Sequence, residues 1–438
     1  MAQTRILIVA HSAVLFTGIS EVLRNIFVPL QIQCPHEYDL FQIGLHHCSA
    51  VTDAPWKIIS TKTILDDSGE KVLDPGDLLG ELTIPEILAS FHPQVIFLFN
   101  DPQCILRQLE CIPRSFKTVA YVTFDGVPVP REYAALSRVT KLVTMSEFGR
   151  EAYLMATGVS PHLISVMYAP ADTARFRPVS VEEKVEMRSE LLPSCIPLDS
   201  FIVGWVGRNQ WRKQMWTIYH VLSIVRGGNY IECVNCRTVR DPSLGSHFCA
   251  KCGDARSEQG KRRLGVYLWI HMPTGRENGT WVLKDLEEYY DMHSERDIYY
   301  TDNCDTRHHL HADSIPALYQ LWDCLLFLSG GEGFGVPAWE AMASGIPVIY
   351  SDYSSHAEYL SNADAGMAIG GILQPEPSNC IMRHVSDIYM AVDAVCKLQD
   401  DSSLRRTFGI NGRAYCEQYN CLNVAGKWHS LLQIVNST

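Results

Sequence analysis

A glycine-rich segment with two glutamates is the part of this 438-residue sequence whose residue types and spacing best suit chemistry. The segment reads Ser-Gly-Gly-Glu-Gly-Phe-Gly-Val-Pro-Ala-Trp-Glu over residues 329–340. Its glycines would let the backbone approach a ligand closely, and free amides at the start of the following helix would suit an anion. Glu332 can accept hydrogen bonds from sugar hydroxyls, and Glu340, about one helical turn further on, from a ribose. Taken singly, each glutamate is equally well explained as a solvated or helix-stabilising carboxylate.

Four of the 15 cysteines form a second candidate site, with the spacing Cys-x2-Cys-x12-Cys-x2-Cys. Two such pairs facing each other suit tetrahedral zinc. Four thiolates complete the coordination sphere and leave no position for water, so we expect a structural zinc. The predicted ligands are Cys233, Cys236, Cys249 and Cys252, in a zinc ribbon at residues 228–262. The other cysteines are scattered, which is typical of a protein in a reducing cytoplasm.

The elements that position these residues are predicted from short apolar runs that alternate with helical patterns. Strands are expected at residues 5–10, 94–99, 118–123, 141–144, 201–206, 265–271, 298–300, 324–329 and 348–350. Short apolar strands alternating with helices indicate the α/β class, with parallel sheets covered on both faces. Such sheets bind ligands beyond the carboxyl ends of their strands, where Glu332 would lie.

A change of composition near residues 178–200, which are polar and charged and contain three prolines, divides the chain into two doubly wound domains. We expect an N-terminal Rossmann-like domain at 1–178, a linker at 179–199 and a C-terminal Rossmann-like domain at 200–410, interrupted by the zinc ribbon. Residues 411–438 are predicted as C-terminal helices.

The composition is that of a globular protein without a membrane span. Hydrophobic residues make up 47% and charged residues 20%, which excludes a disordered chain. The longest apolar runs are far shorter than the roughly 20 residues of a membrane helix. The run at residues 6–16 contains His11 and Ser12 and has no cleavage-site pattern, so we expect no signal peptide and a cytoplasmic location. A net charge of −12 argues against binding nucleic acid or an anionic membrane over the whole surface.

The glutamate segment resembles the signature of the family-4 glycosyltransferases, which are retaining enzymes of GT-B fold that use nucleotide sugars. The matching pattern is Gly-Glu-Gly-Phe-Gly-x-Pro-x-x-Glu-Ala-Met-Ala-x-Gly-x-Pro-Val. The resemblance implies two Rossmann-like domains facing across a cleft, and transfer of a hexose from a nucleotide-diphosphate sugar without a catalytic metal. It implies that Glu332 binds the donor sugar's hydroxyls, that the amides of Gly333, Phe334 and Gly335 line the same region, and that Glu340 binds the ribose.

A basic segment, Val-Gly-Arg-Asn-Gln-Trp-Arg-Lys at residues 206–213, is similar to the family's Gly-Arg…Lys-Gly segment. Breaking the bond between nucleotide and sugar leaves a diphosphate that gains negative charge. An arginine fork and a lysine point charge would stabilise it without a metal, so Arg208 and Lys213 are the predicted catalytic cations. Arg212 is predicted as a spare cation, and a solvated basic loop is the alternative.

The N-terminal domain departs from the family pattern. Many members have a histidine where this chain has Phe-Asp-Gly at residues 124–126, so Asp125 is the candidate for contacting donor or acceptor hydroxyls; the alternative is a plain turn residue. A general base is not expected, because the resemblance implies that the departing phosphate takes the acceptor's proton. Gly18 resembles the glycine beside the donor phosphates. Glu358 is a candidate for facing the nucleotide, although a capping box with Ser355 is the favoured explanation.

The charge of the predicted ribbon bears on partners. Residues 226–263 hold eight basic and four acidic residues, an excess of four that falls to about two with a zinc tetrathiolate. A basic ribbon favours a polyanionic partner such as nucleic acid, and raises the alternative that the acceptor is a hydroxymethylated base in DNA, as for phage DNA glycosyltransferases. Stapling a loop or contacting a protein is the other explanation. The Arg-His-His-Leu-His run at 307–311 is predicted as a solvated loop rather than a metal site.

The expected function is therefore a glycosyltransferase with a hydroxyl acceptor. The competing class is a non-catalytic GT-B scaffold that presents the ribbon to a partner. That class is disfavoured by the presence of four residues together, since a chain without catalytic activity has no physical need for all of them. These residues are Glu332, Glu340, Arg208 and Lys213.

Overall fold

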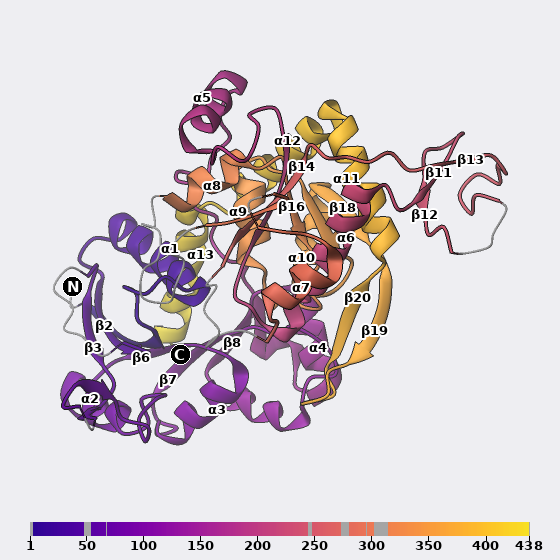
Figure 1. Ribbon diagram of the computed structural model, residues 1–438. Helices are drawn as coiled ribbons and strands as arrows, with labels where there is room; N and C mark the ends of the chain where they lie inside the picture. Colours follow the sequence, from indigo (N-terminus) through magenta and orange to yellow (C-terminus); the bar gives the residue numbers. More distant parts are fainter. Residues whose placement is uncertain are drawn as a thin grey trace. The chain divides into compact units, whose positions relative to one another are not determined.

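The computed structural model describes residues 3–47, 54–66, 68–243, 248–272, 280–294, 296–301 and 314–437, and the predicted loop at 307–311 lies outside them. The chain divides into two compact units. Unit 1 comprises Met1–Asp172 and Gln418–Thr438, and unit 2 comprises Thr173–Glu417. In Figure 1 the two segments of unit 1 have the opposite ends of the colour scale, indigo to magenta and yellow.

Unit 1 is built on a seven-stranded parallel sheet of order β3-β2-β1-β6-β7-β8-β9. Its strands are β1 (Thr4–His11), β2 (Tyr38–Leu45), β3 (Lys57–Ser60), β6 (Val95–Phe99), β7 (Lys117–Val122), β8 (Lys141–Thr144) and β9 (Ile164–Val166). Its helices are α1 (Gly18–Gln33), α2 (Thr83–Phe91), α3 (Pro102–Glu110), α4 (Glu147–Thr157) and α13 (Cys421–Ser437), with a small hairpin of β4 (Thr63–Leu65) and β5 (Lys71–Leu73). Every residue of β6 is buried, as a strand covered on both faces requires.

The last helix of the chain completes the core of unit 1. Trp428 of α13 is 0% exposed, and its ring packs edge-on against Phe97 of β6 and Tyr121 of β7, with ring centroids 5.2 and 5.0 Å apart. The chain enters this helix beside the end of the first segment, where the amide of Ala171 donates to the carbonyl of Tyr419 at 2.8 Å. A C-terminal segment therefore supplies part of an N-terminal core.

Unit 2 is built on a six-stranded parallel sheet of order β15-β14-β10-β16-β17-β18. Its strands are β10 (Phe201–Val206), β14 (Val266–His271), β15 (Ile298–Tyr300), β16 (Cys324–Phe327), β17 (Val348–Ser351) and β18 (Gly366–Ile369). Its helices are α5 (Val181–Leu191), α6 (Met215–Gly227), α7 (Leu283–Tyr290), α8 (Ile315–Leu321), α9 (Val336–Ala343), α10 (Ser354–Ala363), α11 (Ile388–Asp400) and α12 (Ser402–Gln418). A hairpin of β19 (Gly371–Pro375) and β20 (Met382–Ser386) follows β18.

The two sheets confirm the predicted α/β class with two Rossmann-like domains. The structure corrects one local prediction: the residue that precedes α10 as its cap is Tyr353, without a side-chain cap bond, and Ser355 is the second residue of the helix. Ser355 and Glu358 therefore do not form a capping box at this helix start. Among the described residues, no helix combines the length and apolar composition needed to cross a membrane.

Candidate functional site

The predicted catalytic residues of unit 2 lie in two loops at the carboxyl end of its sheet. Strands β10 and β16 are parallel neighbours, with Val203 opposite Cys324, so the loops after their carboxyl ends begin side by side. Lys213 lies in the first loop and Glu332 in the second. The strand order reverses between these strands, because β14 and β15 lie on one side of β10 while β17 and β18 lie beyond β16. Ligands bind at such reversal points in doubly wound sheets.

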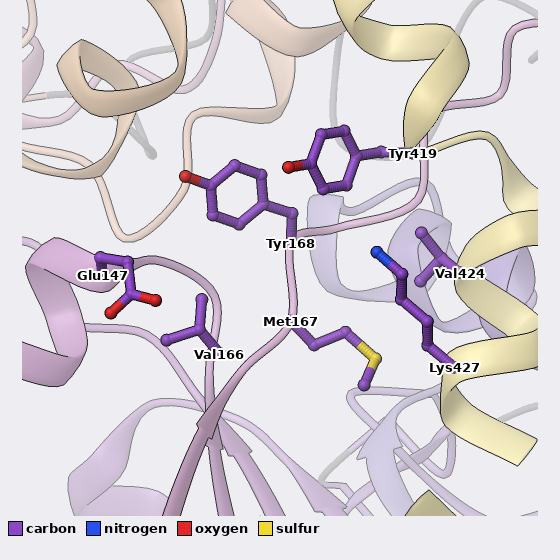
Figure 2. Close-up of a pocket in the computed structure, with 7 residues that line it drawn as sticks. All are labelled: Glu147, Val166, Met167, Tyr168, Tyr419, Val424 and Lys427. Atoms are coloured by element: carbon purple, nitrogen blue, oxygen red, sulfur yellow. The ribbon is translucent and has the colours of Figure 1, made fainter. Parts of the chain in front are cut away.

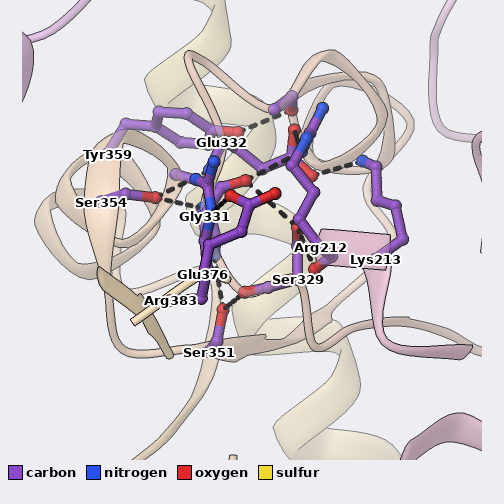
Figure 3. Close-up of polar contacts among 12 residues, drawn as sticks. Arg212, Lys213, Ser329, Gly331, Glu332, Ser351, Ser354, Tyr359, Glu376 and Arg383 are labelled. Atoms are coloured by element: carbon purple, nitrogen blue, oxygen red, sulfur yellow. Dashed lines mark hydrogen bonds and ion pairs between the residues drawn. The ribbon is translucent and has the colours of Figure 1, made fainter. Parts of the chain in front are cut away.

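Glu332 is a buried carboxylate held by two cations (Figure 3). Its side chain is bonded to Lys213 through Oε1, and Nη1 of Arg212 lies 2.7 Å from Oε2. Arg212 also donates to the carbonyl of Gly331 at 2.8 Å. Glu332 and Lys213 are only 5% and 6% exposed. The group therefore concentrates two positive charges and one negative charge in surroundings that screen them weakly.

The electrostatics keep this glutamate ionised. Burial by itself raises the pKa of Glu332, but the charges of Arg212 and Lys213 outweigh burial and hold that pKa well below its usual range. A permanently ionised carboxylate accepts hydrogen bonds and donates none, so Glu332 can accept from hydroxyl groups.

The turn that carries Glu332 is fixed by bonds to two other segments. The amide of Gly330 donates to the carbonyl of Arg212 at 2.7 Å, and the carbonyl of Gly330 accepts from the amide of His384 in β20 at 2.9 Å. A Cβ on Gly330 would lie 2.7 Å from Nε2 of Gln214, so a larger residue does not fit without a shift. Gln214 in turn donates to the carbonyl of His384 at 2.6 Å. The β19–β20 hairpin thus joins both loops of the site.

The start of α9 depends on a second glycine. Gly335 has φ +94° and caps the helix, a conformation that other residues rarely adopt. Its carbonyl accepts from the hydroxyl of Tyr359 at 2.8 Å. Glu340, the fifth residue of α9, is partly exposed and accepts from the hydroxyl of Tyr319 at 2.7 Å. The predicted placement of Glu340 one turn inside the helix is confirmed.

The other predicted residues lie as follows. Arg208 is exposed in the loop after β10 and makes no hydrogen bond or ion pair with any residue that the structure describes. Glu358 is partly exposed on α10. Asp125 and Gly18 belong to unit 1, where Asp125 is partly buried after β7 and Gly18 is the exposed first residue of α1.

Sequence reasoning missed two features of this site. It treated Arg212 as a spare cation, whereas Arg212 binds the carboxylate of Glu332 directly. It also missed Ser351, Ser354 and His356, which bond to the turn or to one another beside it. The Ser-Ser-His run at 354–356 is the only sequence signal for these residues, and a capping pattern obscured it.

The four predicted zinc ligands converge in unit 2. They lie in or beside a three-stranded sheet of β11 (Ile231–Cys233), β12 (Val239–Arg240) and β13 (Ser257–Gln259), and their sulfur atoms lie within 4.8 Å of one another. The Sγ atoms of Cys233 and Cys252 are 3.6 Å apart, and those of Cys236 and Cys249 are 3.5 Å apart. Four sulfurs at about 2.3 Å from a tetrahedral zinc would be about 3.8 Å apart, so the cluster fits this metal.

The charge of this insertion is lower than its own sequence indicates. Arg226 and Arg263, which flank the insertion at 228–262, are paired with Asp297 at 2.6 Å and with Asp400 at 2.7 Å. Without these two paired arginines, residues 228–262 hold six basic and four acidic residues, an excess of two that the −2 charge of a zinc tetrathiolate would cancel. The argument for a nucleic-acid partner loses its basis in charge.

Unit 1 contains a cavity of about 220 Å³ that the sequence did not indicate (Figure 2). Its lining residues are Glu147, Val166, Met167, Tyr168, Tyr419, Val424 and Lys427. The rings of Tyr168 and Tyr419 stack with centroids 5.0 Å apart, and Nζ of Lys427 lies 5.1 Å from the ring centre of Tyr419. None of the predicted site residues lines this cavity.

Part of unit 2 matches a known family. Residues 297–379 match the model of the family described as glycosyl transferases group 1, and this segment includes Glu332, Glu340 and Glu358. No curated protein sequence matches the chain.

Solved structures show the same fold over nearly the whole length. Sucrose-phosphate synthase from Thermosynechococcus elongatus aligns with a TM-score of 0.70 at 15% identity, covering 99% of both chains. A glycosyltransferase from Rickettsia africae aligns with a TM-score of 0.61 at 15% identity, covering 100% of this chain and 99% of the other. HepE from Anabaena, in complex with UDP-glucose, aligns with a TM-score of 0.65 at 12% identity, covering 98% of this chain and all of the other. The chain therefore has the GT-B fold, with a segment of unit 2 that matches the group 1 glycosyltransferases.

Proposed function

We propose that the protein is a retaining glycosyltransferase that moves a hexose from a nucleotide-diphosphate sugar to a hydroxyl acceptor. The observation that carries this proposal is the buried Glu332 carboxylate, held by Lys213 and Arg212 where the strand order of unit 2 reverses. Its segment matches the group 1 glycosyltransferases. Because the similar HepE structure contains UDP-glucose, UDP-glucose is the first donor to test.

The donor sugar and ribose are assigned to the second loop and α9. The ionised Glu332 accepts hydrogen bonds from the sugar hydroxyls, and the amides of Gly333, Phe334 and Gly335 contribute donors to the same region. Glu340 accepts from the ribose hydroxyls, with Tyr319 holding its carboxylate in place. Glu358, which lies one turn inside α10, is assigned to face the nucleotide.

The first loop supplies the positive charge for the leaving group. The ammonium group of Lys213, which is bonded to Glu332, is assigned to a phosphate oxygen of the donor as well. The exposed guanidinium of Arg208 can bind the same diphosphate by two parallel hydrogen bonds. These cations stabilise the charge that develops as the bond between sugar and phosphate breaks, so the reaction needs no catalytic metal.

The configuration of the transferred sugar is retained when the acceptor attacks from the same face that the diphosphate leaves. The departing phosphate then takes the acceptor's proton, and no side chain acts as general base. In unit 1, Asp125 is assigned to the sugar hydroxyls and Gly18 to the neighbourhood of the donor phosphates.

The four cysteines of the insertion are proposed to hold a structural zinc. A zinc tetrathiolate has no open position, so the ion would supply folding energy to the three-stranded sheet and would take no part in transfer. Cys233, Cys236, Cys249 and Cys252 would be its ligands.

A panel of nucleotide sugars tests the function. A ligand at about a hundred times its dissociation constant stabilises the folded state by roughly 2.7 kcal/mol, which a thermal-shift assay detects. UDP-glucose and its nucleotide and sugar variants should raise the melting temperature, and the best of them should be slowly hydrolysed. If no nucleotide sugar stabilises the protein or is turned over, the proposed function is wrong.

A further inference from the structure

A buried hydrogen-bond network lies directly beneath the turn that carries Glu332. The hydroxyl of Ser351, at the end of β17, donates to the carbonyl of Ser329 at 2.5 Å and is 2.9 Å from Nε2 of His356. The hydroxyl oxygen of Ser354 accepts from the amide of Glu332 at 2.9 Å and lies 3.3 Å from Nδ1 of His356. None of these five residues is more than 5% exposed.

The contacts determine where the protons of His356 lie. Ser351 has a single hydroxyl proton and donates it to the carbonyl of Ser329, so its oxygen must accept from the ring. Nε2 of His356 therefore carries a hydrogen, and Nδ1 is the acceptor for the hydroxyl of Ser354. With the neutral Nε2–H tautomer, each donor in the network gives its one proton to one acceptor.

The network ties both ends of one turn to a single side chain. Through Ser351 the imidazole reaches the carbonyl of Ser329, and through Ser354 it reaches the amide of Glu332. The side chain of Glu332 extends from the second of these points toward Lys213 (Figure 3). The closeness of the packing is evident at Gly335, where an added Cβ would lie 3.0 Å from the Cβ of His356.

We propose that His356, as the neutral Nε2–H tautomer, is a positioning residue that fixes the Glu332 carboxylate for transfer. The proposal rests on the proposed function, because it assigns to Glu332 the donor sugar's hydroxyls. His356 does not contact the donor and acts through the two serines. Because small displacements of reacting groups can cost about 100-fold in rate, loss of the network should lower kcat more than it raises KM.

Conservative variants separate the effect of the hydrogen bonds of His356 from the effect of its size. In His356→Phe an aromatic ring still fills the site, but both hydrogen bonds are lost. Glutamine places an N–H near the position of Nε2, so His356→Gln keeps the donor to Ser351 and loses the acceptor for Ser354. Ser354→Ala removes the acceptor of the Glu332 amide at little cost in volume, and it remains informative if His356→Phe does not fold. Ser189→Ala, on the exposed face of α5, is the matched control.

The kinetic experiment measures kcat and KM for UDP-glucose turnover well below each variant's melting temperature. We expect kcat to fall about 100-fold in His356→Phe and at least tenfold in Ser354→Ala, with KM changed less than about threefold and partial rescue in His356→Gln. Ser189→Ala should match the wild type. Wild-type turnover with unchanged kcat in His356→Phe and Ser354→Ala would overturn the positioning role while leaving the function intact.

A second measurement does not depend on turnover. Nitrogen-15 NMR of histidine-labelled protein, with His356→Gln to assign the signal, reports which ring nitrogen carries hydrogen. A protonated Nε2 and an unprotonated Nδ1 at neutral pH are expected, and the opposite tautomer would overturn the proposal. If the tautomer is found but the wild type turns over no nucleotide sugar, the proposed function fails and the described network remains only a structural one.

Discussion

Lys213 and Glu332 are 119 positions apart in the chain, yet the ammonium group of one is bonded to the carboxylate of the other inside unit 2. Their two loops leave neighbouring parallel strands, β10 and β16, at the same edge of the sheet. Arg212 completes the contact from the second carboxylate oxygen. The pair therefore fixes the relative position of the two loops to which the donor is assigned.

Removing the charge of Lys213 should destabilise the protein. In Lys213→Met the buried carboxylate keeps only Arg212, and breaking buried ion pairs costs about 3–5 kcal/mol, so a loss of about 3 kcal/mol is expected. Denaturant unfolding measures it. Arg150→Met, which breaks the largely exposed pair with Glu147, is the control and should lose far less. Equal losses in both variants would contradict a buried, coupled pair.

Removing the charge of Glu332 should reduce transfer. Glu332→Gln preserves shape but replaces a carboxylate that accepts hydrogen bonds with an amide, and about a 100- to 1,000-fold fall in turnover is expected. Steady-state kinetics with UDP-glucose measure the fall, and Glu186→Gln, an exposed substitution on α5, should leave turnover unchanged. Turnover within a few-fold of the wild type would remove Glu332 from the donor site.

Acid should destabilise the protein through His356. Burial lowers its pKa from 6.5 to about 4; Lys213 and His384 act in the same direction, while Glu332 opposes them. The unfolded chain therefore takes up the proton first, and the free energy of unfolding falls as the pH drops from about 6.5 to about 4. At about pH 4.5, protonation of His356 in the unfolded chain lowers the free energy of unfolding by about 2.5 kcal/mol relative to neutral pH.

Unfolding curves at about pH 7 and pH 4.5 test this dependence, with the matched variants His356→Gln and His162→Asn. His162 is exposed in a surface turn, so its variant should keep the full loss of stability. His356→Gln should lose less between the two pH values. The prediction fails if both variants show the same acid loss as the wild type.

The cysteine cluster should hold one zinc per chain, measurable by elemental analysis of the purified protein. Cys249→Ser should abolish zinc binding and make the chain near residues 230–260 sensitive to protease, because the small sheet loses its central crosslink. Cys195→Ser, which lies outside the cluster, should keep the metal. Transfer should survive in Cys249→Ser, since no cluster residue is assigned to the donor. Zinc content unchanged by Cys249→Ser would exclude this site.

The alternation of apolar strands and helices predicted nine of the 13 strands of the two sheets, because parallel strands buried on two faces leave short, wholly apolar runs such as Val95–Phe99. Strands β2, β3, β9 and β18 were not predicted. The Glu332 turn was predictable because its glycines lie close together in the sequence, in the same short segment as Glu332. The choice of Arg212 over Arg208 as partner of Glu332 was not predictable, since it depends on a single turn at Trp211–Lys213 and on Gln214 at φ +46°.

Contacts between segments that are distant in the chain could not be predicted from the sequence either. His356 was not identified because its role is defined by serines of β17 and α10 and by the backbone of another loop. The helical pattern of residues 411–438 predicted C-terminal helices but not which core they would join. The packing of Trp428 against Phe97 and Tyr121 places α13 in unit 1.

The return of α13 to unit 1 has a consequence for synthesis on the ribosome. Unit 2 is continuous over Thr173–Glu417 and can close as soon as it emerges, whereas the apolar surface around Phe97 and Tyr121 must wait for Trp428. At about 5–20 residues per second, that wait lasts on the order of ten seconds or more. The nascent half-domain is then the species that chaperones would have to shield.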